Sequence, residues 1–386
     1  MSAYCKYCWP SKTKSHLNNH IEYYHDKLLG KFLKRKKQSN FWGKFLEILA
    51  KINIVKFVSN PDDSNLYNRS LIFFKEAKKR GLNVSAIQAF GKYDNTFKYI
   101  LNDQAIYYDG IPLNRIGDPI IDLDNKIEIK KILQKNNLPV STGGYFTKLD
   151  EAIQFSHLLT YPLIVKPNNG SLSHHVIGPI KNEQELRKAI EIVQLYRPDF
   201  IIEEYIVGRL YRATVIGKKH VFICEKDPAN IIGNGQSTIA QLISKKNSKR
   251  GKKDQFDTTL HEIPIDNVLK SKLQFLQLNL KSILPKSKKI YLHEKFVLNA
   301  GCDIISRTTS THQENKKLFL KVAQVLDVDI VGIDFICADI ERPWNKQKSA
   351  IIETNSLPYV DMHQYPSQGV PDPVAKVVWD HILASK

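Results

Sequence analysis

Near its C-terminal end the chain reads Ile351-Ile352-Glu353-Thr354-Asn355, an apolar segment that finishes in carboxylate and amide side chains. A β-strand alternates its side chains between two faces, so Glu353 and Asn355 share one face. A second apolar segment, 330–336, carries Asp334 within it. Oxygen donors of this kind on neighbouring strands suit Mg²⁺ that is bridged to phosphate groups. The two segments therefore predict a magnesium and phosphate site on a sheet.

A third apolar segment, Leu163-Ile164-Val165-Lys166-Pro167, has a lysine near its end. A buried strand tolerates a charge that has a partner, so Lys166 either contacts an anion or reaches solvent at the strand end. The residues that follow, Asn168-Asn169-Gly170-Ser171, offer backbone N–H groups and a hydroxyl that suit phosphate oxygens. A helix expected over 124–135 adds two further phosphate-binding candidates, Lys130 and Lys131.

The composition excludes several classes of protein. The 386 residues are 42% hydrophobic and 25% charged, which is ordinary for a globular protein and unlike disordered, collagenous or coiled-coil chains. No apolar run reaches the length of about 18 residues that a transmembrane helix needs, and the first ten residues lack an apolar signal region. Five cysteines are too few for a disulfide scaffold. We therefore expect a multi-domain cytoplasmic protein.

The positive charge is concentrated at the N-terminal end. The chain has 57 Lys and Arg against 39 Asp and Glu, a net charge of +18, and residues 1–60 contain twelve of the basic residues against three acidic ones. Such a segment indicates contact with nucleic acid, a protein or a membrane surface, although most basic stretches are solvated surface. Residues 41–58 have the pattern of a basic amphipathic helix, and most such helices dock on their own protein.

Cysteine and histidine residues precede that helix. Cys5 and Cys8 are followed after eleven residues by His20 and His25, close to the spacing of a zinc finger with two cysteine and two histidine ligands. His16 is a spare candidate ligand. A segment of 25 residues cannot bury a core, so zinc would provide the fold of this part. A flexible tail that is rich in cysteine and histidine is the alternative.

Helices and strands are predicted to alternate from residue 64 onward. A helix over 70–80 that ends at Gly81, followed by a strand over 84–87, is typical of α/β structure. Residues 106–111 suggest a hairpin. A strand at 201–202 ends in two carboxylates, Glu203 and Glu204. Further strands are expected over 213–216, 220–223, 330–336 and 350–354, with helices over 183–196, 315–326 and 373–383.

From about residue 64 to residue 386 the sequence resembles the ATP-grasp superfamily, and within it the ATP-grasp module of cyanophycin synthetases and glutathione-synthetase-like ligases. The resemblance is carried by EEYIVGRLYR at 203–212, IGNGQSTI at 232–239, GID at 332–334, ETN at 353–355 and MHQYP at 362–366. It implies an α+β fold in which two α+β lobes enclose ATP. The implied domains are a zinc-finger-like module (1–30), a basic helical linker (31–60), a small α/β pre-ATP-grasp domain (61–122) and the ATP-grasp domain (123–386), with lobes at about 123–207 and 208–386.

The resemblance also implies roles for single residues. The implied ATP contacts are Lys130, Lys166, Gly170, Ser171, Glu203, Glu204 and Ile206. The implied ligands for one or two Mg²⁺ ions are Asp334, Glu353 and Asn355. The implied catalytic cation beside the reacting group is Arg212, with Lys295 and Arg307 as rival candidates.

The implied activity is the ATP-dependent joining of a carboxylate to an amine. The carboxylate takes the γ-phosphoryl group to give an acyl-phosphate and ADP, and the amine of an amino acid or peptide then displaces phosphate. The amine has to lose a proton, for which four histidines are available: His174, His175, His312 and His363.

Two departures from the family pattern leave a second interpretation open. The phosphate loop has few glycines, and Leu210 stands where relatives usually carry a carboxylate for the ribose. A regulatory protein that senses nucleotide or binds nucleic acid on the same fold is therefore the alternative. Residues 1–60 could also recruit a protein or peptide substrate, and the chain could form a homo-oligomer.

Overall fold

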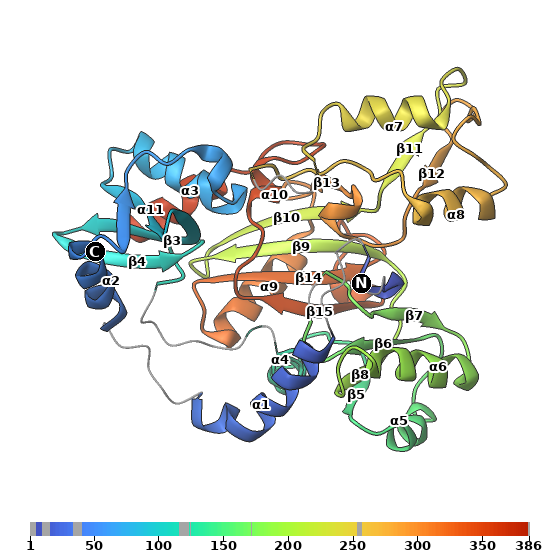
Figure 1. Cartoon of the computed structure of the whole chain (residues 1–386). Helices are drawn as coiled ribbons and strands as arrows, with labels where there is room; N and C mark the ends of the chain where they lie inside the picture. Colours follow the sequence, from blue (N-terminus) through green and yellow to red (C-terminus); the bar gives the residue numbers. More distant parts are fainter. Residues whose placement is uncertain are drawn as a thin grey trace.

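The computed structural model describes residues 5–9, 16–33, 41–115, 123, 125–170, 172–252 and 257–384. In these residues the strands form two four-stranded sheets, one five-stranded sheet and a two-stranded ribbon (Figure 1). The strand pairs of all four are antiparallel. Helices cover these sheets, so the α+β architecture that the sequence predicts is confirmed.

The first sheet along the chain has the order β1-β2-β3-β4. Its strands are β1 (Val55–Val58), β2 (Val84–Ala89), β3 (Lys92–Leu101) and β4 (Gln104–Asp109). Helix α3 (Asn68–Lys79) packs on this sheet and ends before Gly81. Gly81 has a φ of 71°, a left-handed conformation that glycine adopts with little strain. The helix and the strand predicted around Gly81 are both confirmed.

The hairpin predicted at 106–111 is present only as a turn beyond β4, in which Tyr108 and Arg115 form an isolated antiparallel bridge. The hairpin between two full strands lies earlier, with its two-residue turn at Asn102-Asp103 between β3 and β4. Both turn residues have positive φ, 49° and 58°, the conformation of a hairpin turn that follows the twist of its strands. Asn and Asp tolerate this conformation because their short polar side chains hydrogen-bond locally.

The last described helix completes the core of this first unit. Helix α11 (Val374–Ala384) packs against α3, and the side chain of Trp379 is fully buried there. The Trp379 Nε1–H donates to the backbone carbonyl of Phe73 at 2.9 Å, and its ring meets Tyr99 edge-on with centroids 5.1 Å apart. Residues from opposite ends of the chain therefore share one core.

Replacing Trp379 with Ala is expected to lower the free energy of unfolding by about 3–5 kcal/mol, because it opens a cavity and removes the donor to Phe73. Urea denaturation followed by circular dichroism measures the loss. Leu158→Ala, at a side chain that is 79% exposed, is the control and should change stability by less than about 0.5 kcal/mol. Equal losses in the two variants would contradict this role of Trp379.

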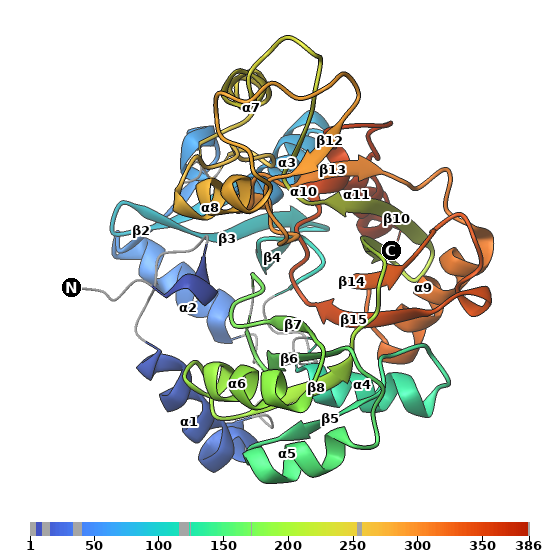
Figure 2. The ribbon, with the colours of Figure 1, turned by 90° about the vertical axis from the view of Figure 1, so that its right-hand side faces the viewer.

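The second four-stranded sheet forms what we call the small lobe, residues 142–206 (Figure 2). Its order is β5-β8-β6-β7, with strands β5 (Gly143–Phe146), β6 (Leu163–Pro167), β7 (Ile177–Ile180) and β8 (Phe200–Glu204). Helices α5 (Leu149–Ser156) and α6 (Glu183–Gln194) bury an apolar core against it.

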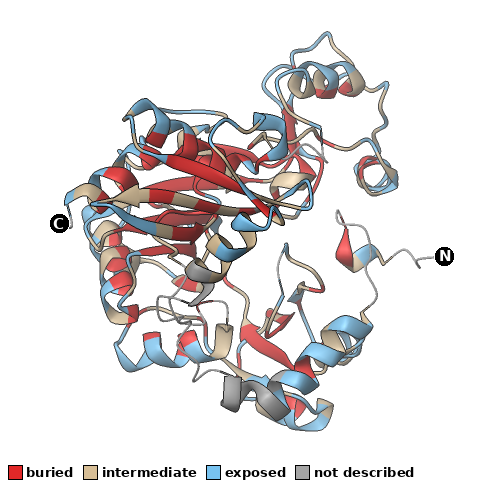
Figure 3. Ribbon diagram, turned by 60° about the vertical axis from the view of Figure 1, so that its left-hand side comes forward, coloured by how far each residue is buried: buried red, intermediate tan, exposed pale blue. Residues whose placement is uncertain are grey.

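The five-stranded sheet forms the large lobe, residues 208–364, with the order β13-β10-β9-β14-β15. Its strands are β9 (Arg209–Ile216), β10 (His220–Asp227), β13 (Asp303–Ser306), β14 (Ile330–Cys337) and β15 (Ser349–Asn355). Helices α4 (Lys126–Lys135) and α9 (Gln313–Leu326) pack on one face of this sheet, whose strands are largely buried (Figure 3). Short helix α10 (Asp361–Gln364) follows β15.

An extension of the large lobe has a small core of its own. It consists of the ribbon strands β11 (Asn230–Ile232) and β12 (Lys289–Tyr291) and the helices α7 (Ile239–Asn247) and α8 (Asn267–Phe275). The extension lies beyond the β10 and β13 edge of the large lobe (Figure 1).

The N-terminal part contains a short 3₁₀ helix (Lys6–Cys8) and helices α1 (Leu17–Leu33) and α2 (Phe41–Lys51). The helix predicted over 41–58 is too long, because Asn53 has a left-handed φ of 58° and Val55–Val58 pairs with β2 as strand β1. Apolar residues of α2 pack against Tyr107, so the helix docks on its own protein. The domain boundaries stay a prediction, although β1 lies inside the stretch assigned to the linker.

None of the described helices combines the length and the apolar character that a membrane span requires.

Candidate functional site

Three adjacent strands of the large lobe bring charged side chains into one row. Arg212 of β9 lies opposite Asp334 of β14, and Asp334 lies opposite Glu353 of β15. Paired residues of neighbouring strands project from the same face of a sheet. The alternate residues, such as Ile333, pack in the core beneath α9, so the charged row faces the other way.

Asp334 is the centre of this row. Its Oδ1 accepts a hydrogen bond from Arg212 Nε at 2.5 Å, and its Oδ2 lies 3.4 Å from Lys226 Nζ of β10. Burial by itself would raise the pKa of Asp334, but the Arg212 and Lys226 charges outweigh burial and lower this pKa to about 2. The carboxylate is therefore ionised at neutral pH, as a metal ligand has to be.

Glu353 and Asn355 lie two residues apart on β15, as predicted, and Asn355 is paired with Gly332 of β14. The buried Nδ2 of Asn355 has no hydrogen-bond partner among the residues that the structure describes. Two carboxylates and one amide oxygen form a set of hard oxygen donors of the kind that Mg²⁺ takes. The residues present thus fit the predicted ion, with Asp334 as the third member of the set.

The small lobe and α4 present lysines to the same space. Lys166, at the end of β6, donates to the backbone carbonyl of Ile352 at 3.3 Å. Lys126, at the start of α4, donates to the carbonyl of Gly170 at 3.2 Å, and its Nζ lies 3.6 Å from Glu353 Oε1. Both lysines line one pocket between the lobes, which is also lined by Gly170, Ser173, His174, Glu203, Glu204, Ile206, Leu210, Lys226, Phe296, Asp334 and Glu353.

Lys130 does not line this pocket. It is buried one helical turn after Lys126, with its Nζ 2.7 Å from Glu203 Oε1, and borders a smaller cavity behind the pocket. The other carboxylate oxygen of Glu203 lies 2.8 Å from Lys166 Nζ. Burial alone would raise the pKa of Glu203, but Lys166 and Lys130 lower it to about 2. Lys130 therefore acts indirectly, because it helps to hold the Glu203 carboxylate that positions Lys166.

Replacing Glu203 with Gln is expected to cost about 3–5 kcal/mol of stability at pH 7, because two ammonium groups stay buried without their counter-ion. In the parent chain the contribution of Glu203 is fully present above its ordinary pKa of 4.5 and is lost as the pH falls towards about 2. Urea unfolding at pH 7 and at pH 3 measures both effects. The difference between the two proteins should shrink at the lower pH, and a difference that does not depend on pH would contradict the ion-pair argument.

The three candidate catalytic cations lie in different places. Arg212 is fully buried, and its Nη1 has no hydrogen-bond partner among the described residues. A Cβ at Gly332 would lie 3.1 Å from this nitrogen, so the glycine leaves room for it. Arg307 instead donates to Glu225 at 2.6 and 2.9 Å, while Lys295 donates to the carbonyls of Tyr7 and Trp9 in the N-terminal segment.

A second pocket adjoins the first and shares Lys226, Phe296, Asp334 and Glu353 with it. It is also lined by Arg212, Asn355 and Asp361, and by Tyr67, Asn68 and Arg69 around the start of α3. Asp361 is buried, its Oδ2 accepts from Thr259 Oγ1 at 2.7 Å, and its Oδ1 has no partner among the described residues. Burial raises the pKa of Asp361. One buried cation and one buried carboxylate thus face the same space.

The four histidines considered as proton acceptors are separated by the fold. His174 lines the pocket between the lobes, and burial lowers its pKa to about 4. His363 is fully buried with its Nε2 2.8 Å from Thr214 Oγ1, and burial lowers its pKa to about 3. His312 caps α9 by accepting from the Glu314 N–H at 3.1 Å. His175 belongs to a different group of side chains.

That group is a Cys/His cluster formed by Cys5, Cys8, His16 and His175, whose ligand atoms all lie within 4.8 Å of one another. The two histidines of this cluster are therefore His16 and His175, and not the predicted zinc ligands His20 and His25. His20 Nε2 is 3.4 Å from the carbonyl of Leu195, and His25 is exposed. Helix α1 starts at Leu17, which carries His20 and His25 away along its axis, whereas His16 stays beside the cysteines.

Sequence reasoning placed the strand-borne carboxylates and missed several neighbours. Lys226 stands at the end of β10 between Glu225 and Asp227, so it lacks the purely apolar surroundings that drew attention to Lys166. Lys126 and Asp361 had no such signal either, because one begins a polar helix and the other follows a loop. Ser171, predicted to contact phosphate, lies outside the described residues.

Comparisons with known proteins agree with this geometry. The chain is 31% identical over 328 residues to the cyanophycin synthetase of Trichormus variabilis, covering 84% of this chain and 36% of that protein. It is 32% identical over 250 residues to the glutathione biosynthesis bifunctional protein of Clostridium perfringens, covering 64% and 32%. The crystal structure of a bifunctional glutathione synthetase from Pasteurella multocida superposes with a TM-score of 0.67 at 23% identity, over 84% of this chain and 45% of that one. No protein-family model matches the chain.

The fold is therefore that of the ATP-grasp superfamily, and the predicted resemblance is confirmed. Within that superfamily the chain is a homologue of cyanophycin synthetases and of bifunctional glutathione biosynthesis proteins. It spans about a third of the length of these curated relatives. The alternative interpretation as a regulatory protein is not favoured by these relatives.

Proposed function

We propose that the chain is an ADP-forming ligase that joins the carboxylate of one substrate to the amine of an amino acid or peptide. The observation that carries the proposal is the charged row Arg212–Asp334–Glu353. Asp334 and Glu353 of this row line one pocket together with Lys126 and Lys166, and Arg212 lines the adjoining pocket. Transfer of a phosphoryl group depends on positioning and on compensation of negative charge, which these residues provide. The names of the relatives support a ligase that makes peptide-like products.

The pocket between the lobes is the proposed ATP site. Lys126 and Lys166 would bind phosphate oxygens from one side, while Asp334, Glu353 and Asn355 would hold Mg²⁺ on the other. When bound, Mg²⁺ supplies charge compensation at the β- and γ-phosphates. The apolar wall that includes Ile206, Leu210 and Phe296 suits the adenine ring.

The adjoining pocket is the proposed site of the amide-forming substrates. Arg212 Nη1, which no described residue contacts by a hydrogen bond, would bind the attacking carboxylate and then the acyl-phosphate oxygens there. Asp361 Oδ1, which likewise has no partner in the described part of the chain, would bind a substrate ammonium group. Because Lys226 and Asp334 line both pockets, substrates bound here would lie next to the transferred phosphoryl group. A zwitterionic substrate, such as an amino acid, matches the two opposite charges.

Incubation with ATP, Mg²⁺ and pooled amino acids and peptides should release ADP and phosphate, and hydroxylamine should trap the acyl-phosphate as a hydroxamate. Glu353→Gln should lower turnover by about 100-fold, because one charge that holds the ion is lost. Glu191→Gln, on the exposed side of α6, is the matched control and should be fully active. The proposal fails if no pool yields ADP and ATP with Mg²⁺ leaves the melting temperature unchanged.

Asp361→Asn should raise KM for the ammonium-bearing substrate about tenfold or more, because a buried charge pair is lost, and should leave KM for ATP unchanged. Steady-state kinetics with each substrate varied in turn separates the two constants. A raised KM for ATP with an unchanged KM for the amine would contradict the assignment of Asp361 to the pocket of the amide-forming substrates.

A further inference from the structure

The Cys/His cluster joins two distant parts of the chain. Cys5 directly precedes the first 3₁₀ helix, Cys8 is the last residue of that helix, and His16 directly precedes α1. His175 comes from the loop between β6 and β7, which borders the pocket between the lobes through Gly170, Ser173 and His174. Three ligand candidates of the N-terminal segment thus meet one side chain of the phosphate-side loop.

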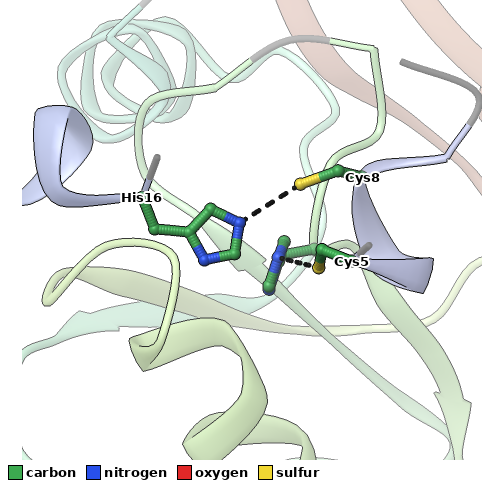
Figure 4. A group of neighbouring side chains, drawn as sticks. Cys5, Cys8 and His16 are labelled. Carbon is green, nitrogen blue, oxygen red and sulfur yellow. Dashed lines mark hydrogen bonds between the residues drawn. The ribbon is translucent and has the colours of Figure 1, made fainter. Parts of the chain in front are cut away.

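The distances in the cluster suit one tetrahedral ion. Cys5 Sγ lies 3.3 Å from His175 Nε2. Cys8 Sγ lies 3.4 Å from His16 Nε2, with Cys5 close by (Figure 4). Zinc–sulfur and zinc–nitrogen bonds of about 2.3 and 2.0–2.1 Å place a sulfur and a nitrogen about 3.5 Å apart in a tetrahedral site. Because all four donor atoms lie within 4.8 Å of one another, they can share one ion after small adjustments.

The orientation of His175 gives independent support. Its Nδ1 lies 2.9 Å from the backbone carbonyl of Ile192, which can act as an acceptor and not as a donor. The proton of a neutral His175 therefore sits on Nδ1, and the lone pair on Nε2 is directed at the cysteines. A histidine that ligates a metal almost always donates its other ring N–H in this way.

The backbone of the loop supports the same conclusion. Leu172, Ser173 and His175 have φ values of 56°, 54° and 50°, a left-handed conformation that costs residues other than glycine about 1 kcal/mol or more each. Such a conformation persists where its surroundings enforce it, and a ligand bond at His175 would do so. The loop is short of glycines, which is the departure from the family pattern that the sequence shows.

We propose that Cys5, Cys8, His16 and His175 bind one structural zinc ion, which fastens the N-terminal segment to the loop beside the pocket between the lobes. Four protein ligands leave no open position, as in structural rather than catalytic zinc sites. The mixed sulfur and nitrogen donors favour zinc over Mg²⁺ or Ca²⁺, which take oxygen ligands.

The fastened segment also contacts the large lobe. Trp9 stacks on His293 with ring centroids 3.8 Å apart, and its Nε1–H donates to Asp266 Oδ2 at 2.6 Å. Lys295 donates to the carbonyl of Trp9 at 2.7 Å. One zinc ion would therefore hold a bridge from the small lobe to the large lobe. An effect of that bridge on ATP binding rests on the proposed function, whereas the zinc site itself does not.

Metal analysis of the purified full-length chain tests the site directly. Inductively coupled plasma mass spectrometry should find about one zinc ion per chain, and Cys8→Ser and His175→Ala should lose it. His175→Cys should keep the ion, because three cysteines and one histidine also form a structural zinc site. His20→Asn and His25→Asn are the matched controls and should retain zinc. Zinc that survives His175→Ala and is lost from the two controls would overturn the ligand set, and a parent chain free of zinc would overturn the site.

Cobalt and hydrogen exchange test the coupling of the site to the loop without any substrate. Co²⁺ added to the zinc-depleted chain should give the visible absorption of a tetrahedral site with thiolate ligands, which His175→Ala abolishes. Zinc removal should increase amide exchange in residues 172–180 and leave residues 233–238 of the large-lobe extension unchanged. Equal exchange in the loop with and without zinc would overturn the fastening. An inactive chain that passes these tests would contradict the proposed ligase and leave the zinc site standing.

Discussion

The ion pair of Arg212 with Asp334 is the interaction on which the large lobe's functional face depends. Two charges are removed from water in the middle of a sheet, and each is tolerable because the other lies 2.5 Å away. The opposite face of the same strands is apolar and is covered by α9, so the sheet has one polar face and one apolar face. Arg212, Asp334 and Glu353, which form the charged row, project from the polar face.

The same logic operates across the cleft. Glu203 lies between Lys130 and Lys166, and its charge holds two lysines at the end of an otherwise apolar sheet. Glu203 and Asp334 thus have the same role in different lobes, because each buried carboxylate holds cations near a pocket. A free ammonium group in such a place would lose its charge or reach for solvent. The cations are therefore in position before any anion arrives.

The sequence allowed some of this arrangement to be predicted and concealed the rest for physical reasons. The strict period of two in a strand fixes that Glu353 and Asn355 share a face, whatever the tertiary structure. A helix gives no such certainty, since Lys126 and Lys130 lie on the same side of α4 and the tertiary packing decides which of them reaches the pocket. His175 could not be predicted either, because it lies 170 positions after Cys5 and no local pattern links the two. His20 and His25, in contrast, have the spacing of a familiar motif.

The N-terminal segment also has a consequence for how the lobes work together. A nucleotide pocket between two lobes is complete when both are close enough to contact the ligand, and a chain that samples an open form binds more weakly in proportion to the time spent open. Contacts of residues 5–9 with His175 on one side and with Asp266 and His293 on the other oppose that opening. The segment would thus raise the population of the closed form without touching the ligand.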